Sequence, residues 1–146
     1  MENYQSAREL ILQMLKTRMA FRQALQHLLR DNNVEMTFEM LQIMTCLWHE
    51  QGVSQQMLAE KTSKDKACLT NLMSNLERRG WVTRQVDPAD GRNRLVYLTP
   101  QGQVANDHIR PLIKELYCQV GQQMGLNQVH ECINQLKKLD EILGQL

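Results

Sequence analysis

The sequence predicts a mainly α-helical protein that contains one small β-hairpin. Apolar residues recur at helical spacing through most of the 146 residues. Between residues 81 and 99 the pattern changes to short runs of β-branched and aromatic residues. The composition, 42% apolar and 23% charged, is typical of a globular protein. We therefore expect a single domain covering residues 1–146.

Composition also excludes several classes of protein. No apolar run approaches the roughly 18 residues that a membrane-spanning helix needs. The first residues lack the apolar stretch of a signal peptide, because Glu2, Arg8 and Glu9 interrupt it. We therefore expect a cytoplasmic protein with no membrane partner.

The cysteines have no paired spacing that predicts a disulfide framework or a zinc site. Without an export signal, we expect reduced thiols that pack as small apolar side chains. We expect no metal and no cofactor. The four cysteines are Cys46, Cys68, Cys118 and Cys132.

The N-terminal third predicts two helices. The first, from about residue 4 to 30, carries a wide apolar stripe and ends at the turn formers of residues 31–33. The second has Thr37 as its N-cap and stops at Gly52.

The middle of the chain predicts two short helices joined by a turn. Ser54 is suited to cap a helix that ends near Thr62, and Asp65 is suited to cap the next. This last helix ends at Gly80, and Arg78 and Arg79 precede that glycine. A glycine just after a helix and cations in its last turn are two usual signals of a helix C-terminus. The spacing is that of a helix-turn-helix.

A hairpin and two long helices complete the chain. Residues 81–86 and 95–99 predict two strands around the polar loop 87–93. Thr99 is expected to cap a helix that has Pro100 at its first position. Pro111 is expected to kink this helix, and we expect a break at Gly121–Gly125 before a last helix.

Charge is concentrated in the middle of a nearly neutral chain. The net charge is +1, but residues 60–94 hold eight Lys and Arg against five Asp and Glu. This local excess of positive charge favours a segment that contacts phosphate, although a solvated surface also produces such differences.

Short motifs run from Ser54 to Gly102 and carry a family resemblance. They are Leu58-Ala59-Glu60-Lys61, Leu76-Glu77-Arg78-Arg79-Gly80, Asp90-Gly91-Arg92 and Leu98-Thr99-Pro100-Gln101-Gly102. In this order they resemble the MarR family of bacterial transcription regulators.

The resemblance implies a winged helix-turn-helix core at about residues 36–100. It also implies dimerisation helices at about 4–30 and 101–146. The expected function is that of a homodimeric repressor that binds a palindromic operator in double-stranded DNA and is released by a small-molecule ligand. We do not expect an enzyme, because the chain has no catalytic triad spacing, carboxylate pair or glycine-rich phosphate loop.

The helix from Asp65 to Arg79 is expected to lie in the major groove. Its polar face, which a merely solvated helix would also show, consists of Lys66, Thr70, Asn71 and Ser74. Asn71 is suited to a bidentate contact with adenine. Many relatives carry arginine at this position, so the base preference is expected to differ.

The hairpin is expected to act as the wing. Arg92 matches the family's wing arginine, and Arg94 is a second cation suited to a narrow minor groove. Lys64 is a candidate phosphate contact. Asp90 is expected to shape the wing by pairing with Arg84 or Arg78.

Two modes of regulation and one other role remain open. The family's ligands predict a pocket for a small apolar or aromatic compound; the candidate lining residues, each also suited to plain core packing, are Phe21, Met44, Trp48 and Leu112. Cys68, near a helix N-terminus, is the candidate for a thiol-based redox switch. A winged-helix module that binds protein instead of DNA is the remaining alternative.

Overall fold

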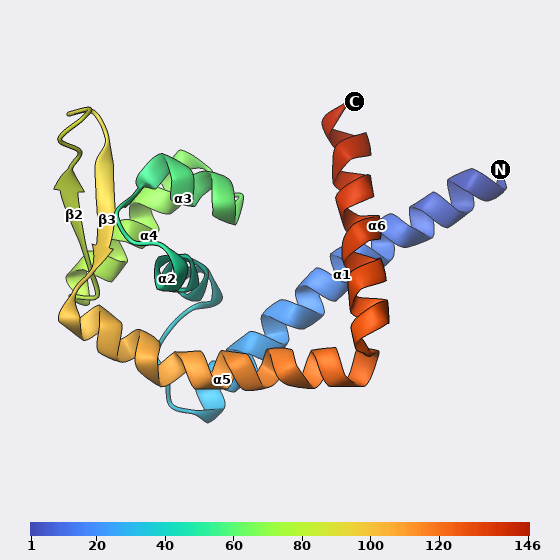
Figure 1. The fold of residues 1–146 in the computed structure, drawn as a ribbon, viewed down its shortest axis with the longest axis horizontal. Coiled ribbons are helices and arrows are strands. Elements are labelled where there is room, and N and C mark those ends of the chain that lie inside the picture. The colour runs from blue at the N-terminus through green and yellow to red at the C-terminus, as the bar shows by residue number, and fades with distance from the viewer. The chain divides into compact units, whose positions relative to one another are not determined.

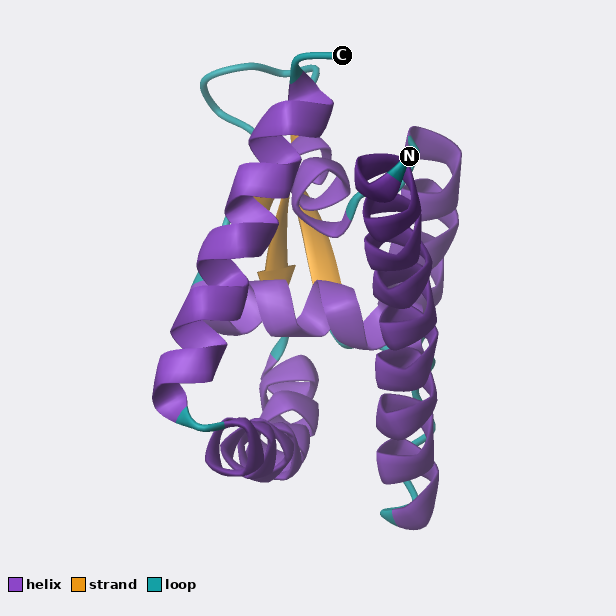
Figure 2. Cartoon of the chain, turned by 90° about the vertical axis from the view of Figure 1, so that its right-hand side faces the viewer, coloured by secondary structure: helices purple, strands orange, loops and turns teal.

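The computed structural model describes all 146 residues as six helices and three strands (Figures 1 and 2). The predicted class, mainly helical with a small sheet, is confirmed. The elements in chain order are α1 (Glu2–Asp31), α2 (Phe38–His49), β1 (Val53–Ser54), α3 (Gln55–Thr62), α4 (Lys66–Arg78), β2 (Val82–Val86), β3 (Arg94–Leu98), α5 (Pro100–Met124) and α6 (Leu126–Gly144).

The chain divides into two compact units, Met1–Asp107 and His108–Leu146. The first unit contains α1 to β3 and the start of α5, and the second contains the rest of α5 and α6. None of the helices combines the length and the apolarity needed to cross a membrane.

Three helices of the first unit begin at the residues that the sequence predicts. The side chain of Thr37 accepts a hydrogen bond from the backbone N–H of Met40 at 3.1 Å. The hydroxyl of Ser54 accepts a hydrogen bond from a backbone N–H in the first turn of α3 at 3.0 Å. The carboxylate of Asp65 accepts one from a backbone N–H in the first turn of α4 at 2.7 Å. Each cap satisfies one of the backbone donors that a helix leaves unpaired in its first turn.

The core of the first unit is built around α2, which contacts α1, α3 and α4. Ile43, Met44 and Leu47 of α2 have no exposed surface. They belong to an apolar core whose other members on neighbouring elements include Leu25, Leu29, Leu58, Leu69, Met73, Leu76 and Val96. This core holds α3 and α4, the two helices of the predicted helix-turn-helix.

The sheet is antiparallel and has the strand order β1-β3-β2. The predicted hairpin is present, with Val82 opposite Leu98 and Val86 opposite Arg94. The sequence indicated two strands, whereas β1 adds a third through the pairing of Val53 with Val96. A two-residue strand is too short to show an alternating pattern, so only pairing with β3 reveals it.

The ends of α4, β2 and β3 meet at Gly80 and Trp81. Gly80 has a φ of +75° and ends α4 in a Schellman motif, in which its N–H donates to Glu77 O at 2.9 Å and that of Trp81 donates to Leu76 O at 3.1 Å. Thr99 returns to this point, because its N–H donates to Trp81 O at 3.0 Å.

Thr99 also caps α5, as predicted, by accepting a hydrogen bond from the N–H of Gly102 at 3.0 Å. Gly102 is packed so closely on the hairpin that a Cβ added to it would lie 1.9 Å from Trp81 O. A side chain therefore does not fit at this position unless the backbone moves.

The expected break in the C-terminal region is shorter than predicted. The helix α5 continues through Pro111 and Gly121 to Met124, and only Gly125, with a φ of +89°, separates it from α6. One glycine inside a helix costs only about 1 kcal/mol relative to alanine, which a long helix tolerates. The turn forms instead where a positive φ is needed.

We expect Gly102→Ala to destabilise the protein by about 1–3 kcal/mol, because the new methyl group must displace the Trp81 carbonyl. Gly121→Ala is the matched control. Nothing lies within 4 Å of its added Cβ, so it should stabilise α5 by about 0.5–1 kcal/mol. Chemical denaturation followed by circular dichroism measures both. Equal stabilities of the two variants would contradict the close packing at Gly102.

Candidate nucleic-acid interface

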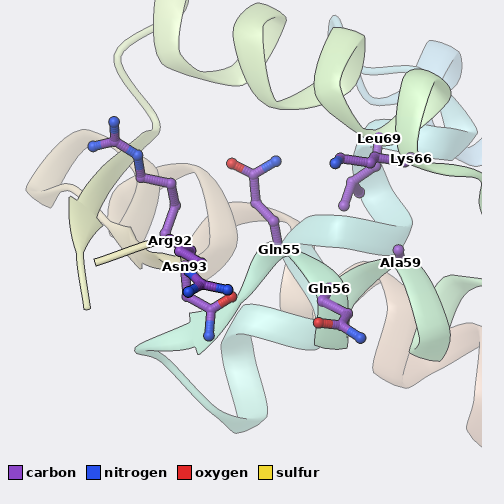
Figure 3. Close-up of a pocket in the computed structure, with 8 residues that line it drawn as sticks. Gln55, Gln56, Ala59, Lys66, Leu69, Arg92 and Asn93 are labelled. Carbon is purple, nitrogen blue, oxygen red and sulfur yellow. The ribbon is translucent and has the colours of Figure 1, made fainter. Parts of the chain in front are cut away.

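A groove of about 470 Å³ lies between α3, the start of α4 and the tip of the β2–β3 hairpin. Figure 3 shows Gln55 and Gln56 of α3 between Arg92 and Asn93 on one side and Lys66 of α4 on the other. The full lining consists of Gln55, Gln56, Ala59, Lys66, Leu69, Arg92, Asn93 and Arg94.

The lining of this groove is cationic and amide-rich, and it contains no carboxylate. Its three cations, Lys66, Arg92 and Arg94, take part in none of the ion pairs of the protein. Each is exposed, so its charge is free to interact with a ligand. Unpaired cations next to neutral donors and acceptors are suited to a polyanion such as a nucleic acid.

The exposed face of α4 is the one that the sequence predicts. Lys66, Thr70 and Asn71 are exposed and Ser74 is half-buried, whereas Leu69, Leu72, Met73 and Leu76 on the opposite face are buried. The Thr70 hydroxyl donates to Lys66 O at 2.8 Å. Its proton is therefore already used, and it has only lone pairs and a methyl group to offer a ligand.

The hairpin tip is built from hydrogen bonds within the loop 87–93. Asp90 Oδ1 accepts from the N–H of Arg92 at 3.1 Å, and Asp87 Oδ1 accepts from that of Ala89 at 2.9 Å. Backbone bonds from Asp87 to Asn93 and from Asn93 to Asp90 close the loop. Arg92 is thereby held at an exposed turn.

The predicted pairing of Asp90 with Arg84 or Arg78 is wrong. Arg84 forms an ion pair with Glu77 instead, and Arg78 donates to Asn75. The Asp90 carboxylate is used locally, because aspartate readily accepts a hydrogen bond from the backbone two residues further along a turn.

Lys64 lies in the turn between α3 and α4 and does not line the groove. This turn is tight: Ser63 has a φ of +53°, and the N–H of Lys64 donates to Ala59 O at 3.0 Å. The half-buried Lys64 remains a prediction as a phosphate contact.

The region that contains most of the groove lining matches a known protein family. The sequence profile described as "MarR family" matches residues 37–93. Residues 37–93 therefore carry the sequence pattern of the MarR family. The match includes α3, α4 and the hairpin loop, which line the groove, together with α2.

Two relatives have similar sequences in this region. Transcriptional regulator HosA of Escherichia coli O111:H- is 38% identical over 61 residues, which are 42% of this chain and 45% of HosA. The HTH-type transcriptional regulator YdgJ of Bacillus subtilis is 40% identical over 62 residues, which are 42% of this chain and 38% of YdgJ. The similarity thus spans less than half of these relatives.

Solved structures resemble the whole chain. Reduced AbfR bound to DNA has a TM-score of 0.80 at 20% identity, covering 99% of this chain and 96% of AbfR. NadR in complex with 4-hydroxyphenylacetate has a TM-score of 0.76 at 22% identity, covering 88% of this chain and 89% of NadR. At these identities the likeness establishes the fold, the winged helix-turn-helix architecture around the MarR-family domain.

Sequence reasoning missed the groove residues Gln55, Gln56 and Asn93. Glutamines in the first turn of a helix carry no special signal by themselves. The predicted cap at Ser54 does place them at the start of α3, but only the packing of α3 beside α4 and the hairpin makes them groove residues. Asn93 belongs to the polar loop 87–93, for which the sequence predicts only a turn between two strands.

The four residues predicted to line a ligand pocket have different environments. Phe21, 39% exposed, packs edge-to-face on Phe38 with ring centroids 6.2 Å apart. Met44 is fully buried, and Trp48 is half-buried with an indole N–H that is buried and has no hydrogen-bond partner. Leu112, also half-buried, belongs to the second unit.

All four cysteines are free thiols. Cys68 is exposed in the first turn of α4, whereas Cys46 is half-buried in α2. Burial raises the pKa of the Cys46 thiol, and the nearby positive charge of Lys61 only partly opposes this. The raised pKa favours the protonated form of Cys46, which is the less reactive one. Cys68 directly precedes the groove residue Leu69 in the chain.

Proposed function

We propose that this protein is a sequence-specific, DNA-binding transcription regulator, a homodimeric repressor of the bacterial cytoplasm and not an enzyme. The groove formed by α3, α4 and the hairpin carries this proposal, because its three cations have no ion-pair partner. HosA and YdgJ are both named as transcriptional regulators, which supports the regulatory part of this proposal.

In the proposed complex α4 enters the major groove of a palindromic operator. Asn71 then reads a base edge, with adenine as its preferred partner, and Thr70 and Ser74 lie beside it. Lys64 and Lys66 contact phosphates. The wing places Arg92 and Arg94 in or along the adjacent minor groove, where the potential is most negative. AbfR bound to DNA supplies a precedent of the same fold.

Dimerisation is supported by apolar surface that the single chain leaves uncovered. The helix α6 has no buried residue, although Ile133, Leu136 and Leu143 lie on it and are 42–48% exposed. The helix α1 is similar as far as residue 19, with exposed apolar residues that include Tyr4, Leu10, Leu12, Leu15 and Met19. Contiguous apolar faces of this kind mark protein interfaces.

Release by a ligand is the second part of the proposal. The unpartnered indole N–H of Trp48 is a donor suited to the carboxylate or phenol of a small aromatic acid, and Phe21 offers an exposed ring in the same unit. Met44 is proposed as apolar lining within this unit, and Leu112 of the second unit remains a prediction. The thiol of Cys68 is the alternative switch.

We expect Arg92→Ala to weaken binding to all duplexes and Asn71→Ala to change base preference as well, by about 1–3 kcal/mol at one position. The reason is that a wing cation senses phosphate and groove shape, whereas an asparagine reads a base edge. Operators selected from a randomised duplex library, followed by fluorescence anisotropy of each variant, measure both effects.

Lys138→Ala is the control for the loss of one positive charge, because Lys138 is exposed on α6 and is not one of the residues that line the groove. It should leave affinity and preference unchanged. If Arg92→Ala and Asn71→Ala both bind like the unmodified protein, the proposed docking is wrong.

We expect a homodimer whose two α4 helices lie about 34–36 Å apart, one turn of duplex DNA. Replacing Leu136 and Leu139 with glutamate should shift the protein to monomer and abolish tight operator binding, because charges then face the apolar interface. Light scattering at micromolar concentration measures the mass. A monomeric unmodified protein would overturn this part of the proposal.

Titration of the protein–DNA complex with small aromatic acids and, separately, with oxidants tests the two switches. We expect an aromatic acid to lower DNA affinity at least tenfold, which corresponds to about 1.4 kcal/mol of coupling. Release by oxidants alone, lost in Cys68→Ser, would replace the ligand switch with the thiol switch. No response to either would identify a constitutive binder.

A further inference from the structure

Arg84 joins three elements of the winged helix through its guanidinium group. Its Nε donates to the carboxylate of Glu77, in the last turn of α4. One terminal nitrogen donates to Gln55 Oε1, at the start of α3, over 3.1 Å. Arg84 itself is the central residue of β2. One side chain of the hairpin thus holds both helices of the helix-turn-helix.

The position of Arg84 in the sheet directs it toward the protein interior. Side chains alternate between the two faces of a strand, so Arg84 shares a face with Val82, which is 3% exposed. The side chain of Arg84 is 27% exposed and that of Glu77 is 36% exposed. Partial burial strengthens such a pair relative to one in open solvent.

The cations of the wing behave differently. Arg92 lies in the hairpin loop, Arg94 lies opposite Val86 at the end of β2, and neither has a carboxylate partner. The planar guanidinium of Arg84 already has two oriented acceptors, a geometry that a lysine ammonium does not reproduce. Its charge is neutralised by Glu77 and is not offered to a ligand.

We propose that Arg84 is a positioning residue for DNA recognition. Its bonds to Glu77 and Gln55 fix the orientation of the hairpin relative to α4 and α3, so that Arg92 and Asn71 meet one duplex at the same time. Arg84 itself does not touch DNA. This inference rests on the proposed DNA-binding function and adds to it a residue that acts through the wing.

The first test is whether removing the Glu77 carboxylate weakens or strengthens DNA binding. Removing a carboxylate near DNA normally strengthens binding, because it reduces repulsion from phosphates. Positioning predicts the opposite: Glu77→Ala and Arg84→Ala should each weaken binding to the selected operator about tenfold, which is about 1.4 kcal/mol. Arg84→Lys, which keeps the charge but not both bonds, should be intermediate.

Glu50→Ala is the matched control. It removes the same charge from another ion pair of this unit, Glu50 with Lys61 at 3.3 Å, which does not involve the hairpin. It should leave affinity unchanged or raise it. If Glu77→Ala behaves like Glu50→Ala, the positioning role is wrong.

A double-mutant cycle separates positioning from direct contact. If Arg84 acts through the wing, adding Arg84→Ala to Arg92→Ala should cost little further affinity. Two independent phosphate contacts would instead give additive losses, which would overturn the proposal.

Hydrogen exchange of the DNA-free protein gives a readout that does not depend on the proposed function. In Arg84→Ala the amides of residues 82–98 should exchange faster, while those of α2 remain protected as in the unmodified protein. Unchanged hairpin exchange overturns the positioning role. If the hairpin exchanges faster in Arg84→Ala but the unmodified protein selects no duplex, the bonds of Arg84 are supported and only the DNA-binding function is rejected.

Discussion

The packing of Gly102 against the carbonyl of Trp81 is the constraint on which the unit Met1–Asp107 depends. A Cβ at residue 102 would lie 1.9 Å from Trp81 O, and Thr99 donates to the same carbonyl from its backbone. The hydroxyl of Thr99 also donates to Gly80 O. The end of α4, the base of the hairpin and the start of α5 are therefore fixed at one point, and the Leu98–Gly102 motif serves this junction.

The cationic groove arises from how the acidic residues are used rather than from a large excess of basic ones. Glu77 and Glu50 neutralise Arg84 and Lys61, which lie outside the groove lining. Asp65 caps α4, and Asp87 and Asp90 shape the wing loop through backbone N–H groups. The lining retains unpaired cations, so a nearly neutral chain still presents a local positive surface.

The sequence was informative where a local interaction decides the structure. The caps of α2, α3 and α4 depend on a side chain bonding to the backbone three residues later, so Thr37, Ser54 and Asp65 were predictable. Strand β1, the Glu77–Arg84 pair and the place of Gln56 in the groove depend on contacts between distant segments. No local pattern predicts these, and the family motif alone suggested the wrong partner for Arg84.

Constraint decreases along the hairpin from its base to its tip. The base is fixed by the junction of Thr99 with Gly80, and the middle is tied to α4 and α3 by Arg84. The backbone of the tip is bonded only within the loop 87–93 and at its ends. Such a wing has a set direction but an adaptable end, which suits a cation that must follow the width of a minor groove. In the proposed complex, base reading by α4 and shape reading by the wing place different mechanical demands on the chain, and each of the two elements is held by a different kind of contact.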